Sequence, residues 1–76
     1  MKINIGGQLS FYLPGFPRQL EVPLEEPTRL CEVLANLGIP LAEVYLFVVN
    51  GELVDPQITL VVPDDEVKLY PPVNGG

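Results

Sequence analysis

The strongest constraint on the fold is one stretch whose apolar residues have helical spacing. They fall at positions i, i+3, i+4 and i+7 and therefore share one side of a helix: Leu30, Val33, Leu34 and Leu37. Thr28 is a suitable N-cap, Gly38 can take the left-handed conformation that ends a helix, and Pro40 prevents its continuation. The sequence therefore predicts one amphipathic helix with a single apolar side to bury.

The other apolar segments have the pattern of β-strands, either alternating with polar residues or continuously apolar. The predicted strands are 2–5, 19–24, 44–49, 52–54 and 66–70. Asn50-Gly51 is typical of a tight hairpin turn between the third strand and the fourth. Pro23 lacks a backbone donor and places the end of the second strand at an edge or outside the ladder.

The order of these elements, ββαβ(β)β, predicts the fold class. One helix lying across one face of a mixed sheet buries its apolar side economically. We therefore predict an α+β domain with the β-grasp (ubiquitin-like) fold, a mixed sheet of four to five strands with one main helix. A chain of 76 residues has room for one compact core, which we place at 1–70, followed by a flexible tail at 71–76.

The charge of the chain limits its partners. Four basic residues stand against ten acidic ones, and the net charge of −6 repels nucleic acid phosphates and anionic lipids. The same charge favours a basic protein face as partner, although it is equally an ordinary route to solubility. The sequence has neither a signal-peptide pattern nor a run near the ~18 apolar residues of a membrane span, so we expect a cytoplasmic protein.

Groups for catalysis or metal binding are scarce. The sequence has no His, one Cys and no Gly-rich phosphate loop followed by Lys, so it predicts neither an activated nucleophile nor a metal site. We expect Cys31 to be an inert, partly buried thiol, the acids at 64–66 to be solvated turn residues, and Gly6-Gly7 to loosen or bulge the first strand. Leu60 and Val62 are expected to cap the core. The chain is therefore not expected to be an enzyme alone or to bind a cofactor.

The C-terminal segment is the candidate site. Pro71-Pro72-Val73-Asn74-Gly75-Gly76 follows the last strand without returning to the core. Because glycine has no Cβ, such a tail can thread a narrow channel in a partner and place its carboxylate where a side chain would clash. A tail that simply frays is the competing interpretation.

Three segments resemble the MoaD/ThiS family of ubiquitin-like sulfur carriers. They are Val49-Asn50-Gly51-Glu52-Leu53-Val54, Asp65-Glu66-Val67 and Pro71-Pro72-Val73-Asn74-Gly75-Gly76. The Pro-Pro-Val-x-Gly-Gly ending is most similar to that of small subunits of molybdopterin synthase. The sequence departs from the family pattern at Asp64-Asp65, where Gly-Asp is usual, and in its proline-rich first hairpin loop.

The resemblance implies that Gly76 carries the chemistry, with Gly75 in support. An E1-like adenylating enzyme would use ATP to form the Gly76 acyl-adenylate, and a sulfur donor would displace AMP to leave a thiocarboxylate. In molybdopterin (molybdenum cofactor) biosynthesis the tail would then enter a large synthase subunit, where the thiocarboxylate sulfur attacks a pterin precursor. The implied partners are these two proteins, which the same tail must visit in turn.

Strand alternation predicts where the partners dock. If Val67 and Leu69 face the helix, their neighbours on the strand lie on the open face of the sheet, and an inward Phe47 places its own neighbours there too. With the start of the tail, this gives the predicted partner-binding residues: Leu46, Val48, Lys68, Tyr70, Pro71, Pro72 and Val73.

Other functions fit the same residues. One alternative is a sulfur carrier for thiamine or another acceptor. Another is a ubiquitin-like protein modifier, which would use the same activated glycine to form an amide with a lysine. The sequence does not separate these, because they differ in the nucleophile that is met after activation. A noncovalent interaction module would keep full function without Gly75-Gly76.

Overall fold

The computed structural model describes residues 1–6, 15 and 17–71. In chain order its elements are β1 (Lys2–Ile5), β2 (Gln19–Glu21), β3 (Thr28–Arg29), α1 (Leu30–Leu37), the 3-10 helix η2 (Leu41–Glu43), β4 (Leu46–Val49), β5 (Glu52–Leu53), β6 (Leu60–Val61) and β7 (Glu66–Tyr70). The predicted helix and all the predicted strands are present, although β2, β4 and β5 are shorter than predicted.

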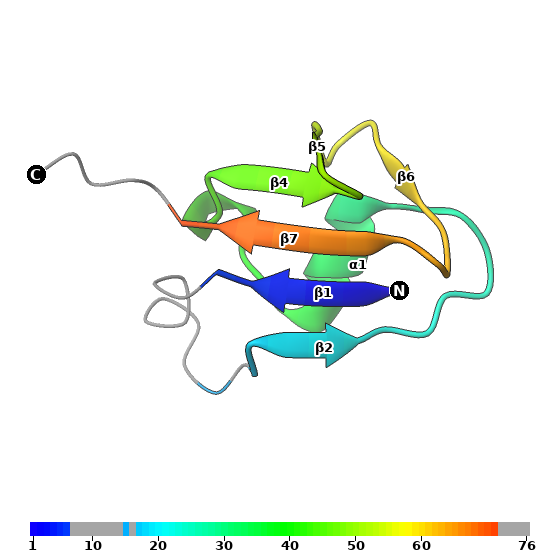
Figure 1. The fold of residues 1–76 in the computed structure, drawn as a ribbon, viewed down its shortest axis with the longest axis horizontal. Coiled ribbons are helices and arrows are strands. Elements are labelled where there is room, and N and C mark those ends of the chain that lie inside the picture. The colour runs from blue at the N-terminus through cyan, green and yellow to red at the C-terminus, as the bar shows by residue number, and fades with distance from the viewer. Residues whose placement is uncertain (7–14, 16, 72–76) are drawn as a thin grey trace, which may run out of the picture.

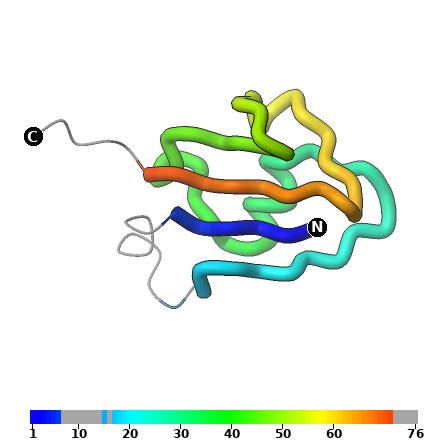
Figure 2. The backbone as a smooth tube through the Cα atoms, in the orientation of Figure 1, coloured from blue at the N-terminus to red at the C-terminus, as the bar shows by residue number. Residues whose placement is uncertain are grey.

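The main sheet is mixed and has the strand order β2-β1-β7-β4-β5. β1 and β7 pair in parallel, and the other neighbours pair antiparallel. Helix α1 lies across one face of this sheet (Figure 1), and the backbone trace shows β1 and β7 running side by side through its middle (Figure 2). The short strands β3 and β6 form a separate two-stranded sheet. This is the predicted α+β arrangement, with five strands in the main sheet.

The hydrophobic core lies between the main sheet and α1. In β1 and β7 buried residues alternate with residues that are exposed or half-buried. The fully buried side chains come from the sheet, the helix and β6: Ile3, Leu30, Leu34, Val61, Val67 and Leu69. Each contributes about 1.5–3 kcal/mol by burial, so the packing holds α1 firmly on one face of the sheet. Among the described residues, no helix covers the other face (Figure 1).

The start of α1 differs from the prediction. Thr28 is not the N-cap, because it belongs to the β3–β6 ladder, and Arg29 takes the N-cap position without a side-chain hydrogen bond. Backbone carbonyls before β6 accept the first helical N–H groups, both at 2.9 Å: Thr59 accepts from Leu30, and Pro56 accepts from Cys31. A tertiary contact therefore satisfies donors that a side-chain cap would otherwise serve. The predicted end of the helix is confirmed, with Gly38 at a φ of 81°.

The expectation that Leu60 and Val62 cap the core is wrong. Leu60 is 58% exposed and Val62 is 38% exposed, whereas Val61 between them is fully buried. Pairing of β6 with β3 sets this register, and a shift of one residue along a strand exchanges the buried and exposed sets. The apolar run alone could not show which set faces inward.

Asn50 joins the β4–β5 turn to the start of β7. It has a φ of 51°, as the predicted hairpin turn requires. Its N–H donates to the Glu66 carbonyl at 2.8 Å, and its Oδ1 accepts from the Glu66 N–H at 3.0 Å. Its side-chain amide donates to Asp65 Oδ1 at 2.8 Å, and Asp65 Oδ2 accepts from the Val62 N–H at 2.8 Å. Asp65 is therefore a structural residue rather than the solvated turn acid that was predicted.

Replacing Asp65 with alanine is expected to destabilise the domain by about 1–2 kcal/mol, because both hydrogen bonds of its carboxylate are lost. Urea unfolding followed by circular dichroism measures the change. The matched control is Asp64→Ala, since Asp64 is exposed and should tolerate the change within about 0.5 kcal/mol. Equal effects of the two substitutions would contradict a specific role for Asp65.

Gly6 directly follows β1 and lies against the backbone of β7. Its N–H donates to the Leu69 carbonyl oxygen at 2.7 Å, so pairing with β7 continues past the end of β1. A Cβ atom at Gly6 would lie 2.9 Å from that same oxygen. The predicted loosening is therefore wrong at Gly6, and Gly7 lies outside the described residues.

We expect Gly6→Ala to lower stability by about 1–3 kcal/mol, because the two backbones must move apart to admit the methyl group. Thermal unfolding is a suitable readout, and Asn4→Ala, at a half-buried position in β1, is the control for a change in the same strand. A Gly6→Ala protein as stable as the wild type would show that the strands have room to spare.

Candidate functional site

The end of β7 determines where the C-terminal segment leaves the fold. The Leu69 carbonyl accepts the N–H of Gly6 at 2.7 Å, and the Tyr70 carbonyl accepts the N–H of Tyr45 at 2.8 Å. Hydrogen bonds from the backbone segments on both sides of β7 therefore hold its last two residues. Pro71 follows and is half-buried. The predicted site residues Pro72, Val73, Gly75 and Gly76 lie outside the described residues.

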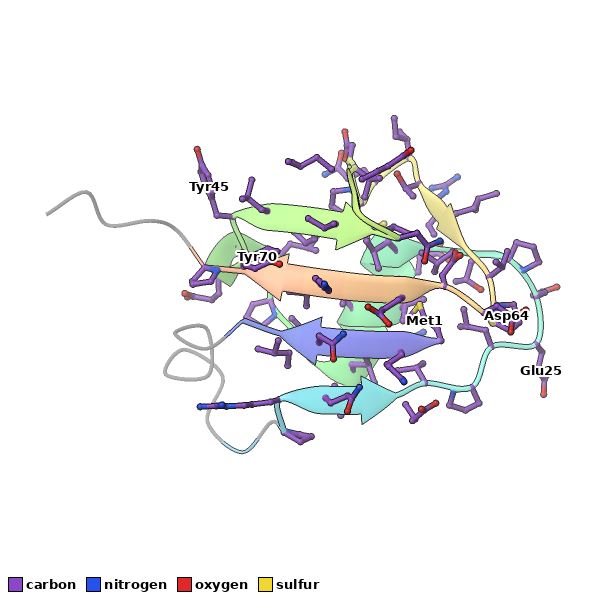
Figure 3. The ribbon with its side chains drawn as sticks, in the orientation of Figure 1. Met1, Glu25, Tyr45, Asp64 and Tyr70 are labelled. Carbon is purple, nitrogen blue, oxygen red and sulfur yellow. The ribbon has the colours of Figure 1, made fainter. Side chains whose placement is uncertain are left out.

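The predicted docking residues of the strands share the face of the sheet that is turned away from α1. Leu46 pairs with Tyr70, and Val48 pairs with Lys68, so each pair projects on the same side. Lys68 and Tyr70 are exposed, while Leu46 and Val48 are half-buried. Figure 3 shows Tyr70 at the end of β7, with Tyr45 at the same end of the sheet. The predicted facing is confirmed, and the binding role of these residues stays a prediction.

The structure adds Leu53 to this surface. Leu53 is 69% exposed and pairs with Val48 across the β4–β5 hairpin, which places the two side chains on one face. Leu53 could have been predicted from the sequence, because the Asn50-Gly51 turn fixes which residues of the two hairpin strands lie opposite each other. We call the group of apolar residues on this face the open-face patch: Leu46, Val48, Leu53 and Tyr70.

The rest of the open face is polar. Lys68 borders the open-face patch and pairs with Asn4 on its other side, and Asn4 pairs in turn with Gln19. Lys2 pairs with Glu21 one step further along the same strands. Among the residues that the structure describes, the apolar part of this face therefore lies on β4, β5 and the end of β7. Apolar surface with a polar border is typical of a protein contact site, and this one lies next to the departure point of the tail.

Within the part of the chain that the structure describes, no three His, Cys, Asp or Glu residues come together to hold a metal ion. Cys31 is half-buried, in agreement with the prediction for its burial. A groove of about 220 Å³ lies between α1 and the segment after β2, lined by Val22, Pro23, Leu24, Thr28, Val33, Asn36 and Leu37. Its lining contains no acid, base or thiol.

None of the described helices is both long enough and apolar enough to span a membrane.

Comparison with protein families identifies the chain. A model of the ThiS family matches residues 11–76, a span that covers α1, the open-face patch and the C-terminal Gly75-Gly76. The chain belongs to the ThiS family. Members of this family are sulfur carrier proteins, so the resemblance drawn from the sequence motifs is confirmed.

A comparison with solved structures agrees on the fold. This ThiS-family chain is similar to a chain in the protein-protein complex of subunits 1 and 2 of the molybdopterin-converting factor from Helicobacter pylori. The TM-score is 0.62 at 22% sequence identity, with 99% of this chain and 96% of that chain covered. The β-grasp fold is therefore shared along essentially the whole length. A search of curated proteins found no significant match.

Proposed function

We propose that this ThiS-family protein carries sulfur as a thiocarboxylate on Gly76 and donates it in molybdopterin biosynthesis. The observation that carries the proposal is the family match, which extends through Gly75 to Gly76. The fold supports it, because β7 is held on both sides up to Tyr70, so that the chain leaves the sheet at Pro71. An E1-like enzyme activates the carrier, and a large synthase subunit accepts the sulfur.

The chemistry requires two steps, the first at a carboxylate oxygen of Gly76 and the second at its carbonyl carbon. In the first, a carboxylate oxygen attacks the α-phosphorus of ATP on the activating enzyme, and pyrophosphate leaves. In the second, a sulfur nucleophile such as hydrosulfide attacks the acyl carbon, the bond to AMP breaks, and loss of a proton leaves the thiocarboxylate. The carrier itself binds no cofactor in this scheme, since ATP belongs to the partner.

The choice of molybdopterin rests on two similarities. The ending Pro71-Pro72-Val73-Asn74-Gly75-Gly76 matches the Pro-Pro-Val-x-Gly-Gly pattern, and the similar solved structure is a complex of molybdopterin-converting factor subunits. The open-face patch beside the tail is the surface proposed to meet the large subunit.

Loss of sulfur from the carrier tests the acceptor. The thiocarboxylated protein is incubated with a molybdopterin synthase large subunit and its pterin precursor, or with a thiazole-forming synthase and its substrates. We expect the thiocarboxylate to return to a carboxylate only in the first mixture. Discharge only in the second mixture would move the protein to thiamine biosynthesis, and an amide to a lysine of another protein would make it a modifier.

A further inference from the structure

A second apolar surface lies on β6 and the residues on either side of it, apart from the open-face patch. It consists of Ile58, Leu60 and Val62, which are 77%, 58% and 38% exposed, and we call it the β6 ridge. Val61 is fully buried, and its pairing with Thr28 of β3 fixes the orientation of the strand. The register of β6 therefore turns Leu60 outward, while Ile58 lies in the turn before the strand and Val62 directly follows it. Single exposed apolar residues are common, but three within five residues are unusual for a surface without a partner.

Carboxylates stand at both ends of the β6 ridge. At one end Asp55 Oδ1 accepts the N–H of Gln57 at 2.9 Å, which places the Asp55 carboxylate beside the residue that precedes Ile58. At the other end Asp64 follows the ridge by two residues and is exposed. Arg29 pairs with Leu60 across the β3–β6 ladder and lies along one side. A complementary partner surface is apolar in its centre and has lysine or arginine at two borders.

A second copy of this chain does not fit the ridge. Antiparallel contact of two ridges places the Asp55 end of each copy against the Asp64 end of the other, and parallel contact places like ends together. In both arrangements carboxylates of one copy face carboxylates of the other and repel them. Each copy also carries a net charge of −6. Three side chains are also far from the roughly 800 Å² per partner of a stable interface. Charge and area therefore favour a different protein that contacts the ridge as part of a larger surface.

The ridge and the tail lie at opposite ends of β7. The Val62 carbonyl accepts the N–H of Asp65 at 3.0 Å, directly before β7 begins, and Tyr70 ends the strand five residues further on (Figure 1). At 3.3 Å per residue the separation is roughly 15 Å. A protein that holds the tail can therefore reach the ridge across one strand length of the sheet.

Of the two partners in the proposed function, the activating enzyme fits the ridge better. It must release the loaded carrier before the tail can reach the synthase subunit, whereas the synthase subunit can hold the carrier until the sulfur is transferred. Small contacts with charged borders suit brief encounters, because the charges raise the association rate without slowing release. We propose that the β6 ridge is a second contact area for the adenylating enzyme, which meets it with an apolar surface bordered by lysine or arginine; this rests on the proposed function.

The test is ATP–pyrophosphate exchange by an E1-like activating enzyme at varied carrier concentration. Leu60→Glu is expected to raise the KM for the carrier about tenfold with kcat unchanged, because the carbonyl carbon of Gly76 is not affected. Asp64→Asn should raise KM about threefold at low salt and lose that effect in high salt. The matched control is Ala35→Glu, which adds the same charge at an exposed position on α1 and should leave KM unchanged.

The outcomes separate this proposal from the function on which it rests. Exchange with the wild type and an unchanged KM for Leu60→Glu overturns the ridge contact alone, whereas no exchange with the wild type removes the proposed function and the ridge contact together. Binding to a synthase large subunit that Leu60→Glu weakens, with KM for activation unchanged, assigns the ridge to the other partner. If the wild type sediments as a dimer and Leu60→Glu dissociates that dimer, the ridge contacts a second copy. This result, like weakened binding to the large subunit, overturns the proposal.

Discussion

Removal of Gly76 is expected to abolish thiocarboxylate formation completely. The shortened chain still ends in a carboxylate, now on Gly75, but that group stops about 3.5 Å short of the activating enzyme's nucleotide. Displacements of about 1 Å can cost a hundredfold in rate, so a full residue leaves no measurable reaction. The readout is the intact mass of the carrier after incubation with the activating enzyme, ATP and sulfide.

Two controls test whether the effect comes from the position of the terminal carboxylate rather than from damage to the fold. Unfolding of the shortened protein should match the wild type, because Gly76 follows the described domain by five residues. Gly76→Ala keeps the chain length and the terminal carboxylate but adds a Cβ atom, and it should react much more slowly than the wild type if the tail threads a narrow channel. Normal sulfur loading of the shortened chain would contradict the role of Gly76.

Tyr70→Glu is expected to weaken binding to both partners by at least about tenfold while leaving the fold intact. Tyr70 is 39% exposed, pairs with Leu46 in the open-face patch and directly precedes Pro71. A carboxylate there must be desolvated against an apolar partner surface, which costs more than 1.4 kcal/mol, about one factor of ten in affinity. Isothermal titration calorimetry with the activating enzyme and with the large subunit measures the two affinities.

The control for this substitution is Gln19→Glu. Gln19 is exposed on β2, on the polar half of the main sheet, so the same charge is added away from the open-face patch. It should bind both partners normally. If Tyr70→Glu also binds both partners with wild-type affinity, the open-face patch is not a docking surface.

Local patterns were sufficient to predict the secondary structure. The spacing from Leu30 to Leu37 predicts α1, and the alternation through Val67 and Leu69 predicts β7 with its correct buried side. Asn50-Gly51 predicts the hairpin, because few residue pairs adopt positive φ at both positions. These features depend on residues close together in the sequence, so one sequence is enough to predict them.

The errors arise where distant segments meet. Thr28 has the side chain of a helix cap, but it pairs with β6, and backbone carbonyls before that strand accept the helix N–H groups. The same pairing turns Leu60 outward. Gly6 is required by its approach to the backbone of β7, and Asp65 by its bond to Asn50. Each depends on a contact over more than ten residues of sequence, which neither periodicity nor turn chemistry encodes.

The candidate site also has one part that local patterns predict and another part that they do not. Alternation predicts that Lys68 and Tyr70 share the open face, and the strand pairing confirms that Leu46 and Val48 join them. Leu53 needed the hairpin register as well. The chemistry of Gly76 comes from resemblance alone, because a terminal carboxylate carries no signal of its reactivity in the local sequence. The identity of the partners lies outside the chain, in surfaces complementary to its own.

Intact-protein mass spectrometry tests the central claim most directly. The full chain is incubated with an E1-like activating enzyme, ATP and a sulfur donor, and its mass is compared with that of a sample without ATP. We predict an ATP-dependent gain equal to the replacement of one oxygen by sulfur, located by fragmentation at Gly76. An unchanged mass with several activating enzymes, and no AMP adduct, would contradict the account and leave a ubiquitin-like domain without carrier activity.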